Sequence, residues 1–182
     1  MEVEHEEVLI ENNKIHVLST AQFNYTSYDA RRLQDVVNYR SHPDIMVLAH
    51  EDDTPDRPAH PYWYACVVRI FYVLVRFRVP GSIELTEPER FDVLWVRWFR
   101  LDSFGASGWA SRRLHMLGFL PPDDSYGPAF GFIDPSRVIR GVHLIPTFSY
   151  GTTQELLGPT KSIAHSELED EDHLLYYLNM CV

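Results

Sequence analysis

Histidines and carboxylates are the residues of this chain whose types and spacing could hold a metal ion. His42, Asp44, His50 and His60 fall within 19 residues, with further carboxylates between them. A rigid zinc site favours a helical i, i+4 pair or a short paired spacing of its ligands, and this set has neither. We therefore predict solvated loop histidines, no metal ligand and no bound cofactor.

Nucleophilic catalysis would need a serine or cysteine beside an activating base. Cys66 stands between Ala65 and Val67 in a β-branched and aromatic run, where a lone cysteine is typical of a packed core. Residues 105–108 lack the spacing of a nucleophile elbow, and the sequence contains no phosphate-binding glycine loop and no dinucleotide fingerprint. The carboxylate runs lie in proline-rich or terminal segments, where no burial is expected to raise a carboxyl pKa for general acid catalysis. We expect no catalytic residue; a hydrolase or nuclease with a site hidden from sequence is an alternative.

Aromatic residues are the other group with chemical potential. Tyr62, Trp63 and Tyr64 enter one apolar run, and Trp98 lies in another. Several rings that converge could form a cage for a methylated ammonium through cation–π attraction. The alternative interpretation is that these rings fill the core of a small β domain. The candidate contacts for a ligand or partner are Tyr62, Trp63, Tyr64, Arg97, Trp98 and Arg100.

The net charge of −10 is distributed unevenly over the 182 residues. Residues 60–150 contain 10 arginines and 8 carboxylates, whereas the rest of the chain contains 6 basic and 18 acidic residues. Because carboxylates are not buried without partners, we expect residues 50–58 and 166–172 to be exposed and mobile. The acidic segments would repel phosphates, so the isolated chain is not expected to bind nucleic acid. An accessory DNA-binding domain that uses the Arg-rich middle is the alternative.

The cysteine content and the hydropathy pattern bear on the compartment. Two cysteines form no disulfide framework, which is typical of a reducing intracellular compartment. The longest apolar stretch, 62–74, is interrupted by Arg69 and is too short to span a membrane, and the acidic N-terminus has no signal-peptide pattern. We expect an intracellular protein without a membrane partner, and a nuclear one if its partner is chromatin.

The first half of the chain predicts a hairpin, a helix and a strand. Residues 8–10 and 15–18 flank an Asn-Asn pair that tolerates the positive φ of a tight turn, which indicates a β-hairpin. Residues 26–37 begin with capping side chains and have apolar residues at i, i+3 and i+4, which predicts a short helix. Residues 45–49 have the pattern of a buried strand.

Two long apolar runs dominate the middle of the chain. Tyr62 to Arg78 is too long for one flat strand, so we expect a bend or bulge in it. Phe91 to Arg100 is apolar on both faces, which predicts a strand that is covered on both sides. We expect Trp95, Val96 and Trp98 to be buried in it.

The last part of the chain predicts further short elements. Residues 109–119 are compatible with a short helix or a strand. Residues 138–146 form a strand pattern in which Gly141 indicates a bulge or a close backbone approach. Residues 174–182 are compatible with a terminal strand or a short helix.

Together these patterns predict a mainly β domain, a small barrel or sandwich with one or two short helices. We expect three parts: an acidic N-terminal segment with the start of a hairpin at 1–14, a β-rich domain at 15–150, and a C-terminal extension at 151–182 with an acidic loop and a terminal strand.

Four long segments, residues 60–71, 94–99, 129–135 and 138–146, resemble one known module. It is the uncharacterised C-terminal region of Plavaka-type (CACTA-related) transposon proteins of mushroom-forming fungi. Residues 24–32 and 42–48 resemble its upstream elements, so that the likeness covers about residues 15–182. The resemblance implies no catalytic residue here, because the transposase core belongs to a different and larger domain. The end of the chain departs from the family pattern, as a truncated or degenerate copy would.

The order of three strand patterns, beginning at residues 44–48, is similar to that of the bromo-adjacent homology (BAH) domain, which mediates chromatin and protein contacts. The resemblance implies a BAH-like fold and a protein or chromatin partner. The leading hypothesis is therefore a non-catalytic, β-rich interaction module. The sequence indicates no particular oligomeric state.

Overall fold

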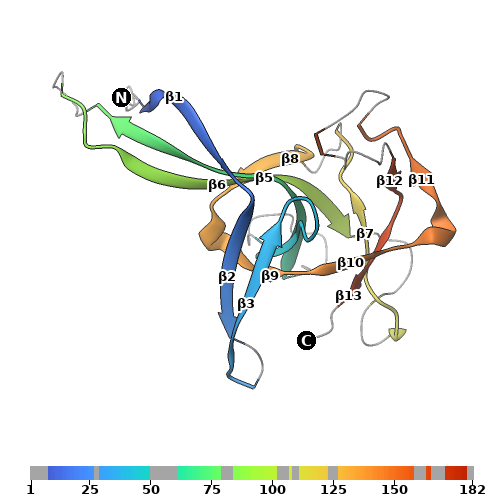
Figure 1. The fold of residues 1–182 in the computed structure, drawn as a ribbon. Coiled ribbons are helices and arrows are strands. Elements are labelled where there is room, and N and C mark those ends of the chain that lie inside the picture. Colours follow the sequence, from blue (N-terminus) through green and yellow to red (C-terminus); the bar gives the residue numbers. More distant parts are fainter. Residues whose placement is uncertain are drawn as a thin grey trace, which may run out of the picture.

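The chain forms an assembly of antiparallel strands in the computed structural model (Figure 1). The structure describes residues 8–26, 29–49, 61–78, 84–101, 107, 111–122, 127–157, 163–164 and 171–179. The predicted mainly β class is confirmed, and the helical residues of the described ranges lie in short 3-10 turns such as η2 (Pro135–Arg137) and η3 (Phe148–Tyr150). The strands are β1 Val8–Leu18, β2 Thr20–Thr26, β3 Arg32–Asn38, β4 Asp44–Leu48, β5 Tyr62–Phe77, β6 Glu89–Leu101, β7 Met116–Phe119, β8 Phe130–Ile133, β9 Val138–Gly141, β10 His143–Pro146, β11 Thr152–Thr153, β12 Asp172–His173 and β13 Tyr176–Asn179.

The centre of the fold is the antiparallel pair of β5 and β6. These strands have 16 and 13 residues, so each can pair with different neighbours along its length. The main sheet runs β10-β13-β7-β6-β5-β4-β9, with β1 added to the far half of β5 and β8 added to β6. A register shift lies between Val67 and Arg69, which confirms the bulge expected in the long strand.

The segment 138–146 supplies both ends of this sheet. Its first half, β9, pairs with β4, and its second half, β10, pairs with β13. Between them the Val142 N–H donates to the Asp44 carbonyl at 2.9 Å. The sheet therefore curls back on itself without closing into a barrel. The irregularity of the β4–β9 register lies opposite Met46 and Val47.

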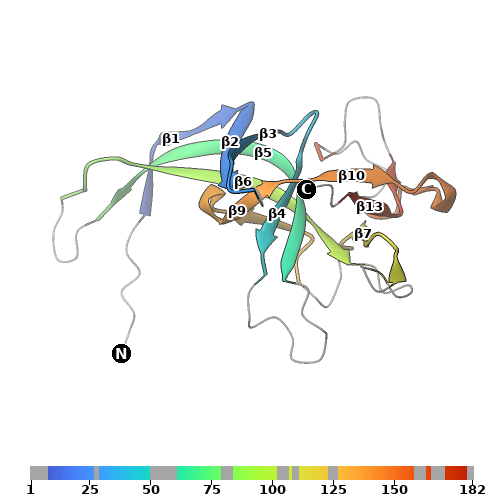
Figure 2. The same cartoon turned by 90° about the horizontal axis from the view of Figure 1, so that it is seen from below.

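The two faces of the β5–β6 pair belong to two separate cores. On one face, Leu94 and Val96 pack under the β2–β3 hairpin, which contributes Phe23 and Val37 (Figure 2). On the other face, Phe99 packs inside the curled sheet with five further buried side chains: Tyr64, Leu117, Phe119, Leu144 and Leu178. The prediction that the strand at 91–100 is covered on both faces is therefore correct for the part of β6 from Leu94 to Phe99.

The predicted burial of the three β6 residues is only partly right. Val96 is fully buried, but Trp95 and Trp98 are partly exposed. The Trp98 ring packs at the border of the first core and meets Trp63 edge to face at 5.6 Å. Trp95 lies beyond the curled part of the sheet, beside Phe130 and Phe132.

The predicted helix at 26–37 is wrong. Residues 20–38 form the β2–β3 hairpin, in which Thr20 pairs with Asn38 and Thr26 with Arg32. Val37 is buried while Val36 points outward, a strand alternation that the helical spacing of apolar residues had concealed. Pairing with 20–26 and burial of Phe23 and Val37 outweigh a modest local helix preference.

The predicted hairpin at 8–18 is also wrong. Asn12 and Asn13 do have positive φ, 55° and 49°, but they form a bulge in the single strand β1. Both halves of β1 pair with β5, because the long β5 edge offers more ladder hydrogen bonds than a hairpin of this length. Of the two alternatives for residues 109–119 and for 174–182, strands are found: β7 and β13. The latter, from the predicted C-terminal extension, lies inside the main sheet between β10 and β7.

The expected exposure of the acidic segments is contradicted at one residue. Residues 50–58 and 166–170 lie outside the described residues, and Glu171 is exposed. Asp172, however, is 4% exposed. Exposure was expected because burying a carboxylate without a partner costs free energy, and the ion pair with Arg97 offsets that cost.

Candidate functional site

The six sequence-predicted contact residues lie on two opposite faces of the sheet. Tyr64 and Arg97 point into the curled sheet, and Tyr62 packs against the same core. The register Ala65 to Trp98 puts the Trp98 ring on the other face, together with its neighbour Trp63. Strand alternation places Arg100 on that second face as well. The sheet thus separates the rings, and they do not form one cage.

Two of the six are inaccessible to a partner. Tyr64 is 1% exposed and Arg97 is 2% exposed. Trp63 and Trp98 remain partly exposed at an interplanar angle of 79°, and Arg100 is exposed. Two rings and one arginine make a surface contact rather than an enclosure for an ammonium group.

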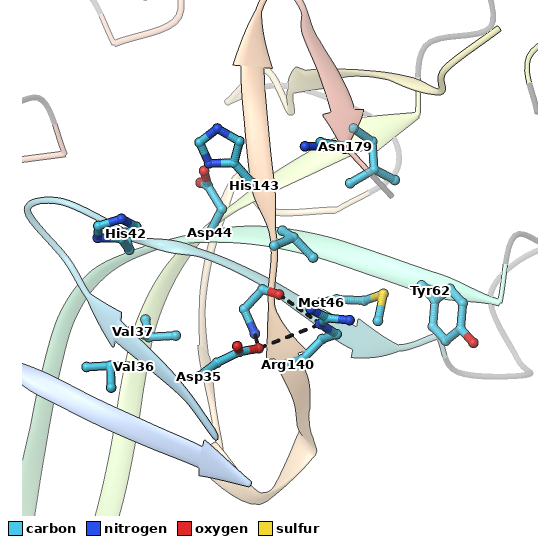
Figure 3. A pocket seen from close by; sticks show the side chains of 13 residues that line it. Asp35, Val36, Val37, His42, Asp44, Met46, Tyr62, Arg140, His143 and Asn179 are labelled. Carbon is cyan, nitrogen blue, oxygen red and sulfur yellow. Dashed lines mark hydrogen bonds and ion pairs between the residues drawn. The ribbon is translucent and has the colours of Figure 1, made fainter. Parts of the chain in front are cut away.

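A pocket of about 400 Å³ opens where the curled sheet meets the β2–β3 hairpin (Figure 3). Its walls come from β3, β4, the start of β5, the β9–β10 segment and β13. Of the six predicted residues, Tyr62 lines it. The lining residues are Asp35, Val36, Val37, His42, Asp44, Met46, Tyr62, Arg140, Gly141, Val142, His143, Leu178 and Asn179.

Asp44 is the acid of this pocket whose environment is unusual. It is the first residue of β4, directly opposite Cys66 on β5. Burial raises the pKa of its carboxyl from the ordinary 3.8 to about 7. Within the described part of the chain, no side chain donates a hydrogen bond to this carboxyl or pairs with it. Asp44 lies outside the carboxylate runs that the sequence expectation concerned, and its place at the start of a buried strand was the sequence signal for its burial.

The opposite wall of the pocket is internally neutralised. The Asp35 carboxylate accepts a hydrogen bond from the Gly141 N–H at 2.9 Å and lies 3.6 Å from Nε of Arg140. The Arg140 guanidinium also lies over the Tyr25 ring, 4.5 Å from its centroid. Figure 3 shows this pair at one end of the pocket and Asp44 with His143 at the other. Asp44 is thus the uncompensated acid of the pocket.

Two strands along the sheet from Asp44 lies a buried ion pair that sequence reasoning missed. Both terminal nitrogens of Arg97 donate to the two carboxylate oxygens of Asp172, at 2.8 and 2.7 Å. The guanidinium also stacks on Phe119, 3.7 Å from the ring centroid. The two residues are 75 positions apart, so the pair attaches the C-terminal strands to the centre of the sheet. It is a structural contact.

Cys66 lies between these two features. It pairs in register with Asp44 on one side and with Arg97 on the other. Burial raises the pKa of its thiol well above the ordinary value, and the Asp44 carboxyl raises it further. A thiol held protonated is a poor nucleophile, and Cys66 packs against the second core as expected for a core residue.

One serine–histidine contact has the elements of a nucleophile and base. The Ser107 hydroxyl lies 2.9 Å from Nδ1 of His115. Neither residue lines the pocket.

No group of three or more potential metal ligands is found among the described residues, and His50 and His60 lie outside them. No described helix is long and apolar enough to cross a membrane.

Comparison of the chain with protein-family models, curated proteins and solved structures found no match. The pocket and its chemistry are therefore the basis for assigning a function.

The raised pKa of Asp44 predicts a pH dependence of stability. The pKa of the Asp44 carboxyl is higher in the folded protein than in the unfolded chain. The protonated carboxyl therefore contributes fully to the free energy of unfolding below about pH 4, and this contribution is lost as the pH rises through about 7. The shift corresponds to at most about 4 kcal/mol, and partial exposure of Asp44 reduces this, so we expect about 2 kcal/mol. Denaturant titrations at pH 4.5 and 8 should show Asp44→Asn more stable than the unsubstituted chain at pH 8 only. Equal stability of the two proteins at both pH values would contradict the burial of an unpaired carboxyl.

Proposed function

We propose that this chain is a non-catalytic protein-interaction module whose pocket binds a lysine or arginine side chain of its partner at Asp44. The observation that carries the proposal is a desolvated carboxyl without a described partner in a pocket of about 400 Å³. Such a carboxyl is stabilised in its ionised form by an approaching cation, which supplies the missing charge. In keeping with the family resemblance, we propose a transposon-derived module, intracellular or nuclear, with a basic protein such as a histone tail as its partner.

The rest of the pocket suits a long cationic side chain. Val142, Met46 and Leu178 provide an apolar wall for the methylene stem, and Tyr62 adds an aromatic ring to the lining. The volume is at the small end of the range for ligand sites, which fits one side chain better than a large cofactor. The net charge of −10 attracts a basic partner over a distance.

The arginines support a protein partner over DNA. A DNA-binding face would leave several of them exposed and free to contact phosphates. Arg76 pairs with Glu11 at 2.9 Å, and Arg97 is buried with Asp172. Arg69 lies over the Tyr39 ring at 4.8 Å. These guanidinium groups are occupied within the fold.

The test is a binding titration of the purified chain with a basic histone-tail peptide and with the same peptide carrying norleucine at each lysine and each arginine. We expect binding to the first peptide only, strengthening from pH 6 to 8 as Asp44 ionises. Asp44→Asn should weaken it at least about tenfold, the effect of losing one charge-assisted contact of about 1.4 kcal/mol or more. Asp92→Asn, an exposed acid paired with Arg90, is the matched control.

Equal affinity of Asp44→Asn and the unsubstituted chain would overturn the pocket assignment. Duplex DNA at 50 and 150 mM salt serves as the competing ligand. Micromolar binding of DNA at 150 mM salt would favour the accessory DNA-binding function instead.

A further inference from the structure

The outer halves of β1, β5 and β6 form a three-stranded arm that extends away from the curled sheet (Figure 1). Directly opposite residues of antiparallel strands share a face. Val17 pairs with Phe71 and Ile15 with Val73, and on the other side Phe91 pairs with Val73. One face of the arm, here called the arm face, therefore carries the apolar residues Val8, Ile10, Ile15, Val17, Phe71, Val73, Val75, Phe77, Phe91 and Val93, with Phe132 of β8 packed against Phe71 at its base. Glu89, opposite Val75, shares this face at its edge.

The two faces of the arm differ sharply in chemistry. On the opposite face, Arg76 pairs with Glu11, and His16 stacks on Tyr72 at 4.5 Å. Arg90 lies 4.1 Å from the centroid of the same Tyr72 ring. That face is polar and internally paired, as expected of a surface that stays in water.

The arm face, in contrast, leaves large apolar side chains exposed. Relative exposures are 55% for Val8, 40% for Ile10, 55% for Ile15, 63% for Val17, 39% for Phe91 and 68% for Phe132. Together these side chains expose on the order of 500–600 Å² of apolar surface, the upper end of what monomers tolerate. No described element covers them.

We propose that a second copy of the chain covers the arm face, so that two arms pack face to face about a two-fold axis. A two-fold interface joins the same patch on both subunits, so the patch must be complementary to itself. The apolar part of the arm face meets this condition, because it carries no charge and no ion is buried unpaired when two such surfaces meet. Glu89, opposite Val75, stands at the first position of β6, where the interface rim would lie.

The area is sufficient for a dimer. Two arm faces of this size bury roughly 1,000–1,200 Å² in total, at the threshold of a specific interface. Sheets that pack in this way interdigitate apolar side chains about 10 Å apart. Apart from Glu89 at the rim, the described residues of the arm face offer a charged peptide no charge to pair with, which distinguishes this face from the Asp44 pocket.

The test is sedimentation equilibrium of the full chain from about 1 to 100 μM. We expect a reversible dimer that Val17→Glu converts to a monomer over the whole range, because two glutamates would be buried near each other. Leu33→Glu, at an exposed β3 position outside the arm, is the matched control and should still dimerise. Phe132→Ser at the base of the arm is a second variant in case Val17→Glu does not fold. A monomeric chain at 100 μM, or a dimer that neither substitution weakens, would overturn the proposal, and a monomer would indicate that something other than a second copy covers the arm face.

Discussion

Replacing Asp172 with leucine is expected to destabilise the fold by about 3–5 kcal/mol, because it leaves the Arg97 guanidinium buried without its counter-ion. The pair is bidentate and both side chains are almost fully buried, so water cannot replace the lost carboxylate. Nε of Arg97 already has no acceptor among the described residues, which leaves the guanidinium dependent on Asp172. Chemical denaturation monitored by tryptophan fluorescence measures the loss.

The double variant Arg97→Met with Asp172→Leu distinguishes charge from packing. Removing both charges also removes the unpaired ion, so most of the stability is expected to return. Asp92→Leu, which breaks the exposed pair with Arg90, is the matched control and should change the unfolding midpoint little. If the double variant is as unstable as Asp172→Leu alone, the unpaired charge is not the cause.

Replacing Leu94 with alanine is expected to cost about 2–5 kcal/mol. Leu94 is fully buried in the core between the sheet and the β2–β3 hairpin, where its loss leaves a cavity. Leu48→Ala removes the same atoms from a side chain that is 62% exposed, and it should have little effect. Thermal and denaturant unfolding of the two variants make the comparison. Similar destabilisation by both would contradict the described position of the core.

The two unusual acids of this chain differ in one respect. Asp172 lies against Arg97, whereas Asp44 has no described cation beside it. Asp44 lies on one side of Cys66 in the curled sheet, and Arg97, the ion-pair partner of Asp172, lies on the other. The same residue type therefore stabilises the fold in one place and forms the proposed binding group in the other.

Alternation along the strands was determined by the sequence itself. The run from Phe91 to Arg100 is largely apolar on both faces, and Leu94 and Phe99 do lie in separate cores. The length of the run at 62–78 was enough to predict a bulge, which lies between Val67 and Arg69. These features depend on neighbouring residues and on the two-residue period of a strand, so they can be read locally.

Strand partners and the candidate site were decided only by the tertiary structure. Residues 8–18 pair with β5 rather than with themselves, and 26–37 form a strand because 20–26 is beside them. Asp44 is unusual because the sheet curls and brings β9, β10 and β13 close to the start of β4. Asp172 can be buried because it forms an ion pair with Arg97, 75 residues away in the sequence. Burial and charge pairing depend on residues distant in sequence, and their energies exceed the local preferences that a sequence pattern measures.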